Sequence, residues 1–267
     1  MYEGMMKNIR IYGKPPFNVA VVHGGPGGAG EVATVAKELS TTRGVLEPLQ
    51  TKSTIEGQLE ELKSVVQENG TLPLTLIGYS WGAWLSFIFA AQNPSLVKKL
   101  ILISSGPFEA SYATNIMKTR LGRLTEQERS EIDLLWEKLK SPTGTEKNKA
   151  FAQLEVYISM ADAYDPLPSH NEALKCHYDI YESIWPEAAE LRRSGKLLAL
   201  GKQIQCPVVA IHGDYDPHPA QGVQKPLSNI LKNFRFILIE NCGHKPWIER
   251  GAQEKFYKLL KEELEEA

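Results

Sequence analysis

The stretch Leu74-Thr75-Leu76-Ile77-Gly78-Tyr79-Ser80-Trp81-Gly82 decides the fold of this sequence. Its first four residues form an apolar run typical of a buried strand, and residues 81–92 have the pattern of a helix that ends before Pro94. Ser80 therefore stands on a sharp turn from a strand to a helix, with a glycine two residues before it and two after it. A glycine-flanked turn without function would share these five letters, but the strand and the helix around them favour an exposed nucleophile.

Apolar runs of strand character alternate with helical patterns on both sides of this stretch. The alternation predicts an α/β fold with a mostly parallel sheet flanked by helices. The predicted strands are 19–22, 45–46, 74–77, 100–103, 208–211 and 234–239. The predicted helices are 31–39, 53–67, 81–92 and about 252–265, and the second of them begins with a capping box of Ser53 and Glu56.

The alternation is interrupted after the strand that ends near residue 104. Residues 107–204 are charged and rich in aromatic side chains, with helical patterns and no convincing strand. We therefore predict an α/β core of residues 1–106 and 205–267, with residues 107–204 inserted as a helical cap, or lid. Such a lid covers the edge of the sheet at which open α/β sheets bind their ligands.

The composition excludes several classes of protein. The 267 residues carry a formal net charge of −2, which gives no basic surface for nucleic acid. The sequence shows neither a signal-peptide pattern at its start nor an apolar run long enough to span a membrane. The scattered cysteines Cys176, Cys206 and Cys242 are typical of reduced thiols, so we expect a cytoplasmic protein. The oligomeric state is left open.

A glycine-rich loop, His23-Gly24-Gly25-Pro26-Gly27-Gly28, follows the first predicted buried strand. Its glycines let backbone N–H groups face a ligand, as an oxyanion hole requires. We predict the amides of Gly25 and Trp81 as the two donors, and we expect His23 to brace the loop. A phosphate-binding loop is the alternative, but the loop lacks both G-x-G-x-x-G in register and a Gly-Lys-Ser/Thr ending.

Two later loops supply an acid and a base. Asp216 follows the strand at 208–211 and is predicted to orient a histidine, whereas Asp214 is predicted to make local turn hydrogen bonds. His244 follows the strand at 234–239, and a glycine before it permits a tight turn. The order Ser80, Asp216, His244 is that of α/β hydrolases and differs from the orders of chymotrypsin-like and subtilisin-like enzymes.

A metal site is an alternative interpretation of the loop that contains Asp216. His212, Asp214, Asp216 and His218 alternate, so on an extended strand they would share a face, and imidazole with carboxylate suits zinc or iron. That interpretation leaves the serine turn and the glycine loop unexplained. We therefore predict neither a metal nor a cofactor.

These loops together resemble the α/β-hydrolase superfamily over residues 20–105 and 205–265. The glycine loop and Ser80-Trp81-Gly82 are similar to the proline iminopeptidase branch, from which Tyr79 departs because that branch usually carries glycine there. The resemblance implies cap carboxylates that bind a substrate's free amine. Glu155, Glu172, Glu182 and Glu187 lie in the right segment, although helical surface charge explains them equally well.

The sequence thus predicts a serine hydrolase that cleaves an ester or amide of a small molecule or short peptide through an acyl-enzyme on Ser80. Cap aromatics, Tyr181 among them, could line an apolar pocket, and Tyr157, Tyr178 and Trp185 are candidates for substrate contact, although core packing between helices is the more common use of such residues. Two alternatives stay open, a lyase that uses the same residues and a binding protein without turnover.

Overall fold

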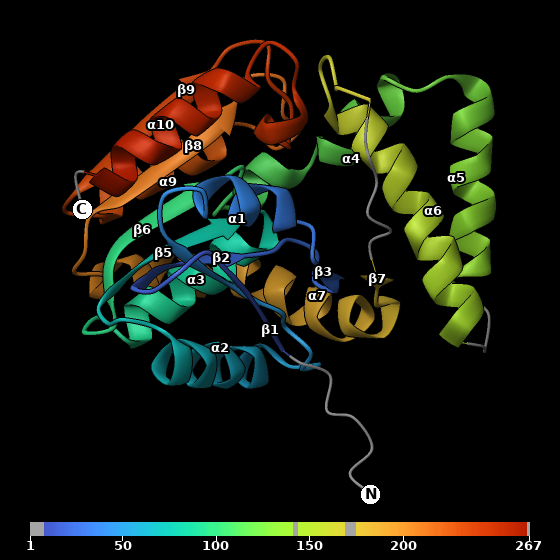
Figure 1. The fold of residues 1–267 in the computed structure, drawn as a ribbon. Coiled ribbons are helices and arrows are strands. Elements are labelled where there is room, and N and C mark those ends of the chain that lie inside the picture. Colours follow the sequence, from blue (N-terminus) through green and yellow to red (C-terminus); the bar gives the residue numbers. More distant parts are fainter. Residues whose placement is uncertain (1–7, 141–143, 169–174, 266–267) are drawn as a thin grey trace, which may run out of the picture.

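The computed structural model describes residues 8–140, 144–168 and 175–265, and its centre is a seven-stranded sheet in the order β1-β4-β2-β5-β6-β8-β9 (Figure 1). Its strands are β1 (Ile9–Tyr12), β2 (Phe17–Val22), β4 (Gly44–Pro48), β5 (Leu74–Tyr79), β6 (Val97–Ile103), β8 (Val208–Gly213) and β9 (Phe234–Ile239). β1 is antiparallel to β4, and the other neighbours are parallel. The predicted fold class is confirmed, and every predicted strand lies within one of these strands.

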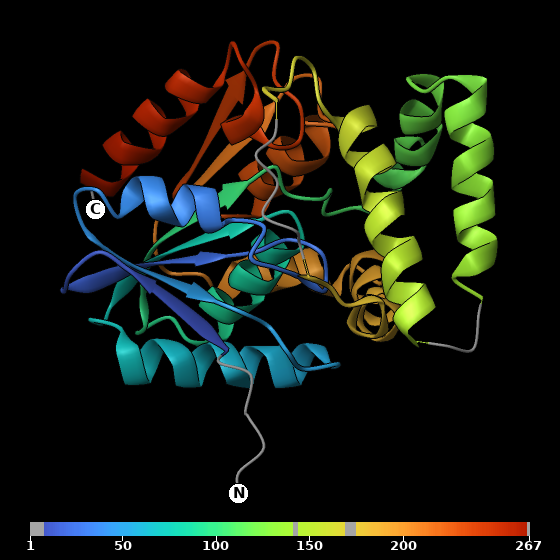
Figure 2. The same ribbon diagram turned by 45° about the vertical axis from the view of Figure 1, so that its right-hand side comes forward.

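Helices cover both faces of the sheet (Figure 2). One face is covered by α1 (Ala33–Leu39) and α10 (Gln253–Glu265), and the other by α2 (Ile55–Asn69), α3 (Trp81–Gln92) and α9 (Gln221–Ile230). Along β6, Ile101 and Ile103 pack in the apolar cluster under α1 and α10, whereas Leu100 and Leu102 pack in the cluster of α3. Burial on both faces explains why the central strands are apolar without alternation.

Two helix starts differ from the predictions. α1 begins at Ala33 rather than at residue 31, because Glu31 stands in the preceding turn and pairs with Lys245. The capping box at residue 53 is also wrong, since the N-cap of α2 is Thr54, whose Oγ1 accepts the N–H of Gly57 at 3.1 Å. Serine and threonine cap helices by the same bond, so adjacent candidates are hard to separate from sequence.

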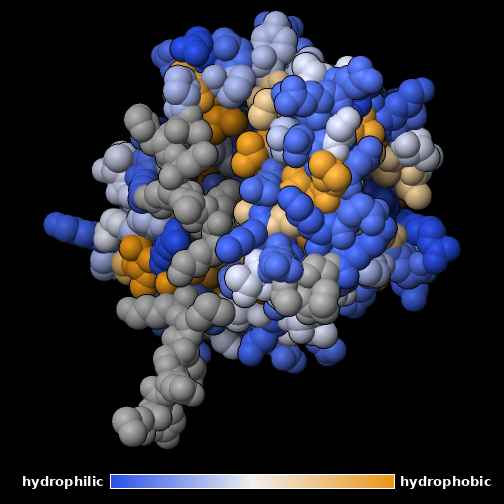
Figure 3. Space-filling model, turned by 90° about the vertical axis from the view of Figure 1, so that its right-hand side faces the viewer, coloured by the Kyte–Doolittle hydropathy of each residue, from blue (hydrophilic) through white to orange (hydrophobic). Residues whose placement is uncertain are grey.

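The segment 107–204 joins the neighbouring strands β6 and β8. Its helices are α4 (Ile116–Gly122), α5 (Glu126–Lys138), α6 (Gly144–Asp162), α7 (Tyr178–Arg193) and α8 (Lys196–Ala199). We call them the inserted helices. α5 and α6 lie side by side away from the sheet and share an apolar cluster of their own (Figure 1). The face on this side of the molecule is mainly hydrophilic, with scattered apolar groups (Figure 3).

The inserted segment also contains a short strand, which the sequence did not predict. β7 (Lys175–Cys176) pairs with β3 (Gly28–Ala29) of the glycine loop. Two residues are too few to show a periodic pattern. In addition, Ile180 and Ile184 of α7 pack in the same apolar cluster as α3, so part of the segment is continuous with the main core. The division into core and cap stays a prediction.

Candidate active site

Ser80 lies at the junction of β5 and α3, in a backbone conformation that few residues other than glycine adopt. Its φ is 52° and its ψ is −115°. At Gly78 an added Cβ would collide with the carbonyl of Gly82, and at Gly82 with the carbonyl of His23. Both glycines are therefore needed for the chain to pass so close to itself, and the turn holds the serine at the carboxyl edge of the sheet.

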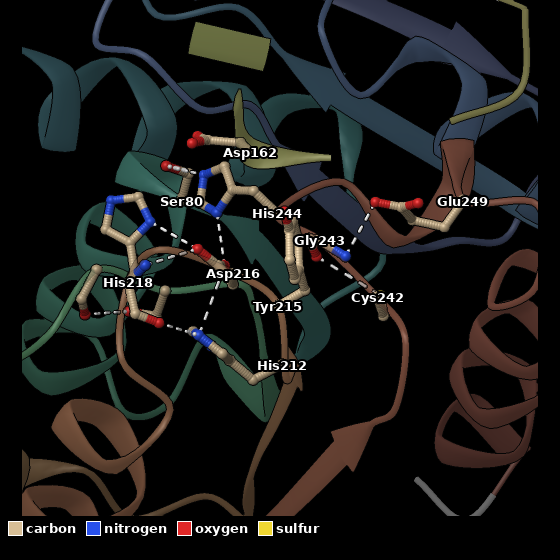
Figure 4. A network of polar contacts seen from close by, with 12 residues as sticks. Ser80, Asp162, His212, Tyr215, Asp216, His218, Cys242, Gly243, His244 and Glu249 are labelled. Carbon is tan, nitrogen blue, oxygen red and sulfur yellow. Dashed lines mark hydrogen bonds and ion pairs between the residues drawn. The ribbon is translucent and has the colours of Figure 1, made fainter. Parts of the chain in front are cut away.

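His244 bridges Ser80 and Asp216 (Figure 4). The Ser80 hydroxyl donates to Nε2 of His244 at 3.1 Å, and Nδ1–H of His244 donates to Oδ2 of Asp216 at 2.7 Å. The backbone N–H of His244 is held by the carbonyl of Asp162 at 2.9 Å, and its ring lies against the ring of Tyr79, with centroids 5.1 Å apart. The structure thus brings together the three residues that the sequence singled out as nucleophile, base and acid.

Asp216 is held by imidazoles on both carboxylate oxygens. Oδ1 accepts the backbone N–H and the Nδ1–H of His218 at 2.9 and 2.8 Å, while Nε2 of His212 lies 3.5 Å from Oδ2. Burial by itself raises the pKa of Asp216, but His244, His218 and His212 outweigh burial and hold that pKa well below its usual value. Asp216 is therefore a carboxylate at neutral pH.

The same contacts act on the pKa of His244 in the opposite sense. Burial lowers this pKa, but the charge and hydrogen bond of Asp216, together with the charge of Asp162, outweigh burial and raise it above its ordinary value. The imidazole is thus made a stronger base by the carboxylate that orients it.

Asp214 does not make the local turn bonds that the sequence predicted. Its Oδ1 accepts the backbone N–H of Cys242 at 3.2 Å, which ties the loop after β8 to the loop that carries His244. Sequence could not show this bond, because its partners are 28 positions apart. Asp214 is also absent from the group of ligand-type atoms that the described residues bring close together.

The side chains of His212, Asp214, Asp216 and His218 do not share one face, as they would on an extended strand. Nε2–H of His212 donates to the carbonyl of His218 at 2.8 Å. Within the described residues, the ligand-type atoms that do approach one another belong to Asp216, His218 and His244, within 4.8 Å. The loop turns after β8, so its alternate side chains no longer share one face.

The glycine loop reaches the site from β2. His23 is fully buried, and its Nδ1–H donates to the carbonyl of Gly24 at 2.7 Å while its Nε2 accepts the N–H of Gln50 at 3.1 Å. It therefore braces the loop, as expected. Gly25 has a φ of 109° and lines the same cavity as Ser80 and Trp81. An oxyanion hole formed by the amides of Gly25 and Trp81 stays a prediction.

A cavity of about 300 Å³ opens above Ser80 and His244. Of the three candidates for substrate contact, Tyr157, Tyr178 and Trp185, the structure places only Trp185 on its wall. Tyr157 packs against the cluster of α5 and α6, and Tyr178 packs against Phe151 and Tyr181. Tyr181, another of the cap aromatics named from the sequence, also lines the cavity, and its spacing of four residues from Trp185 places both on one face of α7.

Charged residues line the cavity, and most of them are paired. Arg120 donates from Nε and Nη2 to the two oxygens of Asp162 at 2.7 and 2.6 Å, and Lys245 pairs with Glu31 at 2.9 Å. By contrast, Arg192 has no carboxylate partner among the described residues, and its guanidinium lies 5.3 Å from the Trp84 ring centroid. Burial lowers the pKa of Arg192, as expected for a cation without a counter-ion.

Of the four cap carboxylates named from the sequence, Glu155 is the only one that the described residues place on the cavity wall. Burial, followed by the charge of Glu31, raises its pKa, and no described residue hydrogen-bonds to it. Glu182 is instead half exposed and pairs with Lys147, and Glu187 lies 3.4 Å from the N–H of Ile55. The fourth, Glu172, lies outside the described residues.

Two further observations concern the predictions of reduced cysteines and of no membrane span. Cys176, Cys206 and Cys242 are free thiols in the structure. In the described parts of the chain, we find no helix with both the length and the apolar character that crossing a membrane requires.

The chain is similar in sequence to a lipase and similar in fold to two solved structures. ABHD6, a monoacylglycerol lipase of Bos taurus, is 27% identical over 224 residues, which are 82% of this chain and 62% of the relative. The chain therefore spans less than two thirds of the length of that relative. Two solved structures share the fold at 18% identity and cover 97% of this chain and 94% of their own. They are VinJ, with a TM-score of 0.65, and a proline iminopeptidase of Mycobacterium smegmatis, with a TM-score of 0.62.

The model of the alpha/beta hydrolase fold matches residues 19–250. This range includes the serine turn, the glycine loop, and the loops that carry Asp216 and His244. The chain therefore belongs to the α/β-hydrolase fold family.

Proposed function

We propose that this chain is a serine hydrolase that cleaves small-molecule esters through an acyl-enzyme on Ser80. The observation that carries the proposal is the series of hydrogen bonds from Ser80 to His244 at 3.1 Å and from His244 to Asp216 at 2.7 Å. The family match and the lipase relative support a hydrolase, and the name of that relative favours an ester substrate.

In the first step, Oγ of Ser80 attacks the carbonyl carbon while its proton moves to Nε2 of His244. Asp216 stabilises the imidazolium that forms and keeps its ring in place. In this mechanism the amides of Gly25 and Trp81 bind the negative oxygen of the tetrahedral intermediate, and each is worth ~3 kcal/mol in the transition state.

The intermediate collapses when the imidazolium gives its proton to the leaving oxygen, so that the alcohol departs and the acyl group stays on Ser80. Water then attacks the acyl carbon and gives a proton to Nε2 of His244. The acid is released when that proton returns to Oγ of Ser80. The raised pKa of His244 favours the two steps in which its Nε2 accepts a proton, first from Ser80 and then from water, because a stronger base takes the proton more readily.

A second candidate is cleavage of an N-terminal aminoacyl bond, and Glu155 favours it. The Glu155 carboxylate lines the cavity and has no hydrogen-bond partner among the described residues. It is therefore available to a substrate ammonium group, whose positive charge would also lower the raised pKa of this carboxyl. A lyase on the same residues cleaves its substrate without adding water, so release of an acid by hydrolysis separates it from a hydrolase.

The test is labelling with a fluorophosphonate, followed by peptide mapping. We expect one label per chain, on Ser80, in the wild type, and none in Ser80→Ala. We expect strongly slowed labelling in His244→Ala, because the proton of Ser80 then has no acceptor. Ser159→Ala is the matched control, since this second serine also lines the cavity but has no histidine partner among the described residues.

Unlabelled enzyme is then assayed with short-acyl aryl esters and with aminoacyl arylamides. Faster release of acid from the esters supports the first candidate, and faster cleavage of the arylamides supports the second. The serine mechanism would be overturned if the wild type took up no label, or if Ser80→Ala were labelled as strongly as the wild type. Either result would favour a binding protein.

A further inference from the structure

His218 repeats the arrangement of His244 on the opposite oxygen of Asp216. Its backbone N–H and its Nδ1–H both donate to Oδ1, at 2.9 and 2.8 Å, and its carbonyl accepts Nε2–H of His212 at 2.8 Å. The side chain is only 13% exposed. Three of its four polar groups are thus fixed by hydrogen bonds, and only Nε2 is left over.

The proton of this imidazole sits on Nδ1, because a carboxylate oxygen can only accept a hydrogen bond. Burial, ahead of all other causes, lowers the pKa of His218 to about 4, and the neighbouring His244 acts in the same direction. His218 is therefore neutral near pH 7. Its Nε2 carries a lone pair, and among the described residues nothing donates to it.

The free nitrogen lies on the side of the ring that faces away from Asp216 (Figure 4). His218 lines the cavity together with Ser80 and His244, and the centroids of the two imidazole rings are 4.6 Å apart. The cavity therefore offers two neighbouring imidazole acceptors. One of them is used by the Ser80 hydroxyl, and the other is available to a ligand.

We propose that Nε2 of His218 binds a hydroxyl group of the alcohol that leaves when the ester is cleaved, which makes monoesters of diols and polyols the preferred substrate class. The proposal rests on the proposed serine mechanism. There, Nε2 of His244 gives its proton to the leaving oxygen, so the leaving alcohol lies beside the His244 ring. A hydroxyl on the neighbouring carbon of that alcohol reaches the adjacent ring. It donates a hydrogen bond to Nε2, and no proton is transferred.

A buried acceptor also explains why an alcohol without this hydroxyl is a poorer substrate. When such an alcohol fills the site, Nε2 loses its contact with water and gains no donor in exchange. One neutral hydrogen bond of this kind changes the rate by about five- to tenfold. An ester whose leaving alcohol is purely apolar is therefore cleaved more slowly by the same factor.

His218 also supports Asp216, and a substitution has to separate the two roles. In His218→Asn the amide nitrogen takes the place of Nδ1 and still donates to Asp216, while the acceptor at Nε2 is removed. In His218→Gln the longer side chain carries a carbonyl oxygen toward the place of Nε2. The control is His212→Asn, which alters a second imidazole beside Asp216 that does not line the cavity.

The measurement compares kcat/KM for 2-hydroxyethyl butyrate and propyl butyrate, which differ by a hydroxyl in place of a methyl group. We expect the wild type to prefer the hydroxylated ester about five- to tenfold, as one hydrogen bond allows. His218→Asn should abolish this preference, because kcat/KM for the hydroxylated ester should fall about five- to tenfold further than kcat/KM for the propyl ester. His218→Gln should recover part of the preference, and His212→Asn should change both esters equally.

A readout without turnover uses N-(2-hydroxyethyl)butyramide and N-propylbutyramide to protect Ser80 from the fluorophosphonate. The hydroxylated amide should protect at lower concentration in the wild type and lose that advantage in His218→Asn. A preference that survives in His218→Asn, or an equal loss on both esters, would overturn the proposal. Failure of the serine mechanism is distinct, because the wild type would then take up no label at all.

Discussion

The floor and the wall of the cavity are built differently. On the floor, the loops after β5, β8 and β9 hold Ser80, Asp216 and His244 in hydrogen bonds to one another. On the wall, the inserted helices contribute Glu155 and Arg192, which have no carboxylate or hydrogen-bond partner among the described residues. The three residues on the floor are thus fixed by one another without a ligand, whereas two of the charged groups on the wall remain unpaired among the described residues.

The largest expected effect comes from breaking the floor. Asp216→Asn should lower kcat by about 10⁴-fold, because an amide in place of the carboxylate favours the wrong tautomer of His244. The measurement is the steady-state rate on a short-acyl aryl ester. Asp214→Asn is the control two residues away, and it should keep most of the activity because its carboxylate binds the N–H of Cys242. Equal losses in both variants would contradict the assignment of the acid.

A paired charge on the wall should matter for stability. Arg120→Met leaves the buried carboxylate of Asp162 without its partner and should lower the free energy of unfolding by about 3–5 kcal/mol. Urea denaturation measures this change. The control is Arg250→Met, which breaks the exposed pair with Asp165 and should cost less than about 1 kcal/mol. Similar values for the two variants would show that burial of the pair is unimportant.

The pH dependence of kcat/KM should reveal an electrostatic effect of Asp162, on the wall, on His244, on the floor. His244 must be neutral to accept the proton of Ser80, so kcat/KM should fall as the pH falls through the raised pKa of His244 and should level off above it. Since the charge of Asp162 helps to raise that pKa, Asp162→Asn should move the decline to lower pH. Asp165→Asn serves as the exposed control. An unchanged or opposite shift in Asp162→Asn would contradict the electrostatic explanation.

The smallest effect is expected from an unpaired charge on the wall. Arg192→Met should reduce the preference for acyl groups with a terminal carboxylate over neutral ones by about two- to fivefold, the range of a partly exposed ion pair. Competition between glutaryl and butyryl aryl monoesters measures the preference. Arg193→Met is the matched control, because Arg193 is exposed and pairs with Glu190 instead. A loss of the same size in both variants would mean that bulk charge, not the cavity, is responsible.

The parts of the site that sequence predicted are those fixed by local backbone constraints. Ser80 could be identified because a strand, two glycines and a helix all adjoin it, and a backbone with a φ of 52° is specified by just such neighbours. His244 and Asp216 follow buried strands of a parallel sheet, and the carboxyl ends of such strands meet at one edge. The order of the loops along the chain therefore implied their convergence.

The wall was predicted less well, because it depends on how helices far apart in sequence pack. Tyr157 and Tyr178 turn toward α5 and α6 rather than toward the cavity, and no local pattern determines that choice. The pairing of Glu31 with Lys245 joins opposite ends of the chain. His218 was considered only as a metal ligand, because a hydrogen bond between residues two apart depends on a turn whose shape sequence does not specify.

The small sheet of β3 and β7 has a mechanical consequence. It joins Gly28–Ala29 to Lys175–Cys176, and the N–H of His177 adds a bond to the carbonyl of Gly27 at 3.1 Å. The loop that carries Gly25 is thus tethered to the beginning of α7, the helix that brings Trp185 to the cavity. A ligand that displaces α7 has to break this tether or drag the loop with it. The position of the Gly25 amide is thereby made sensitive to how the cavity is filled.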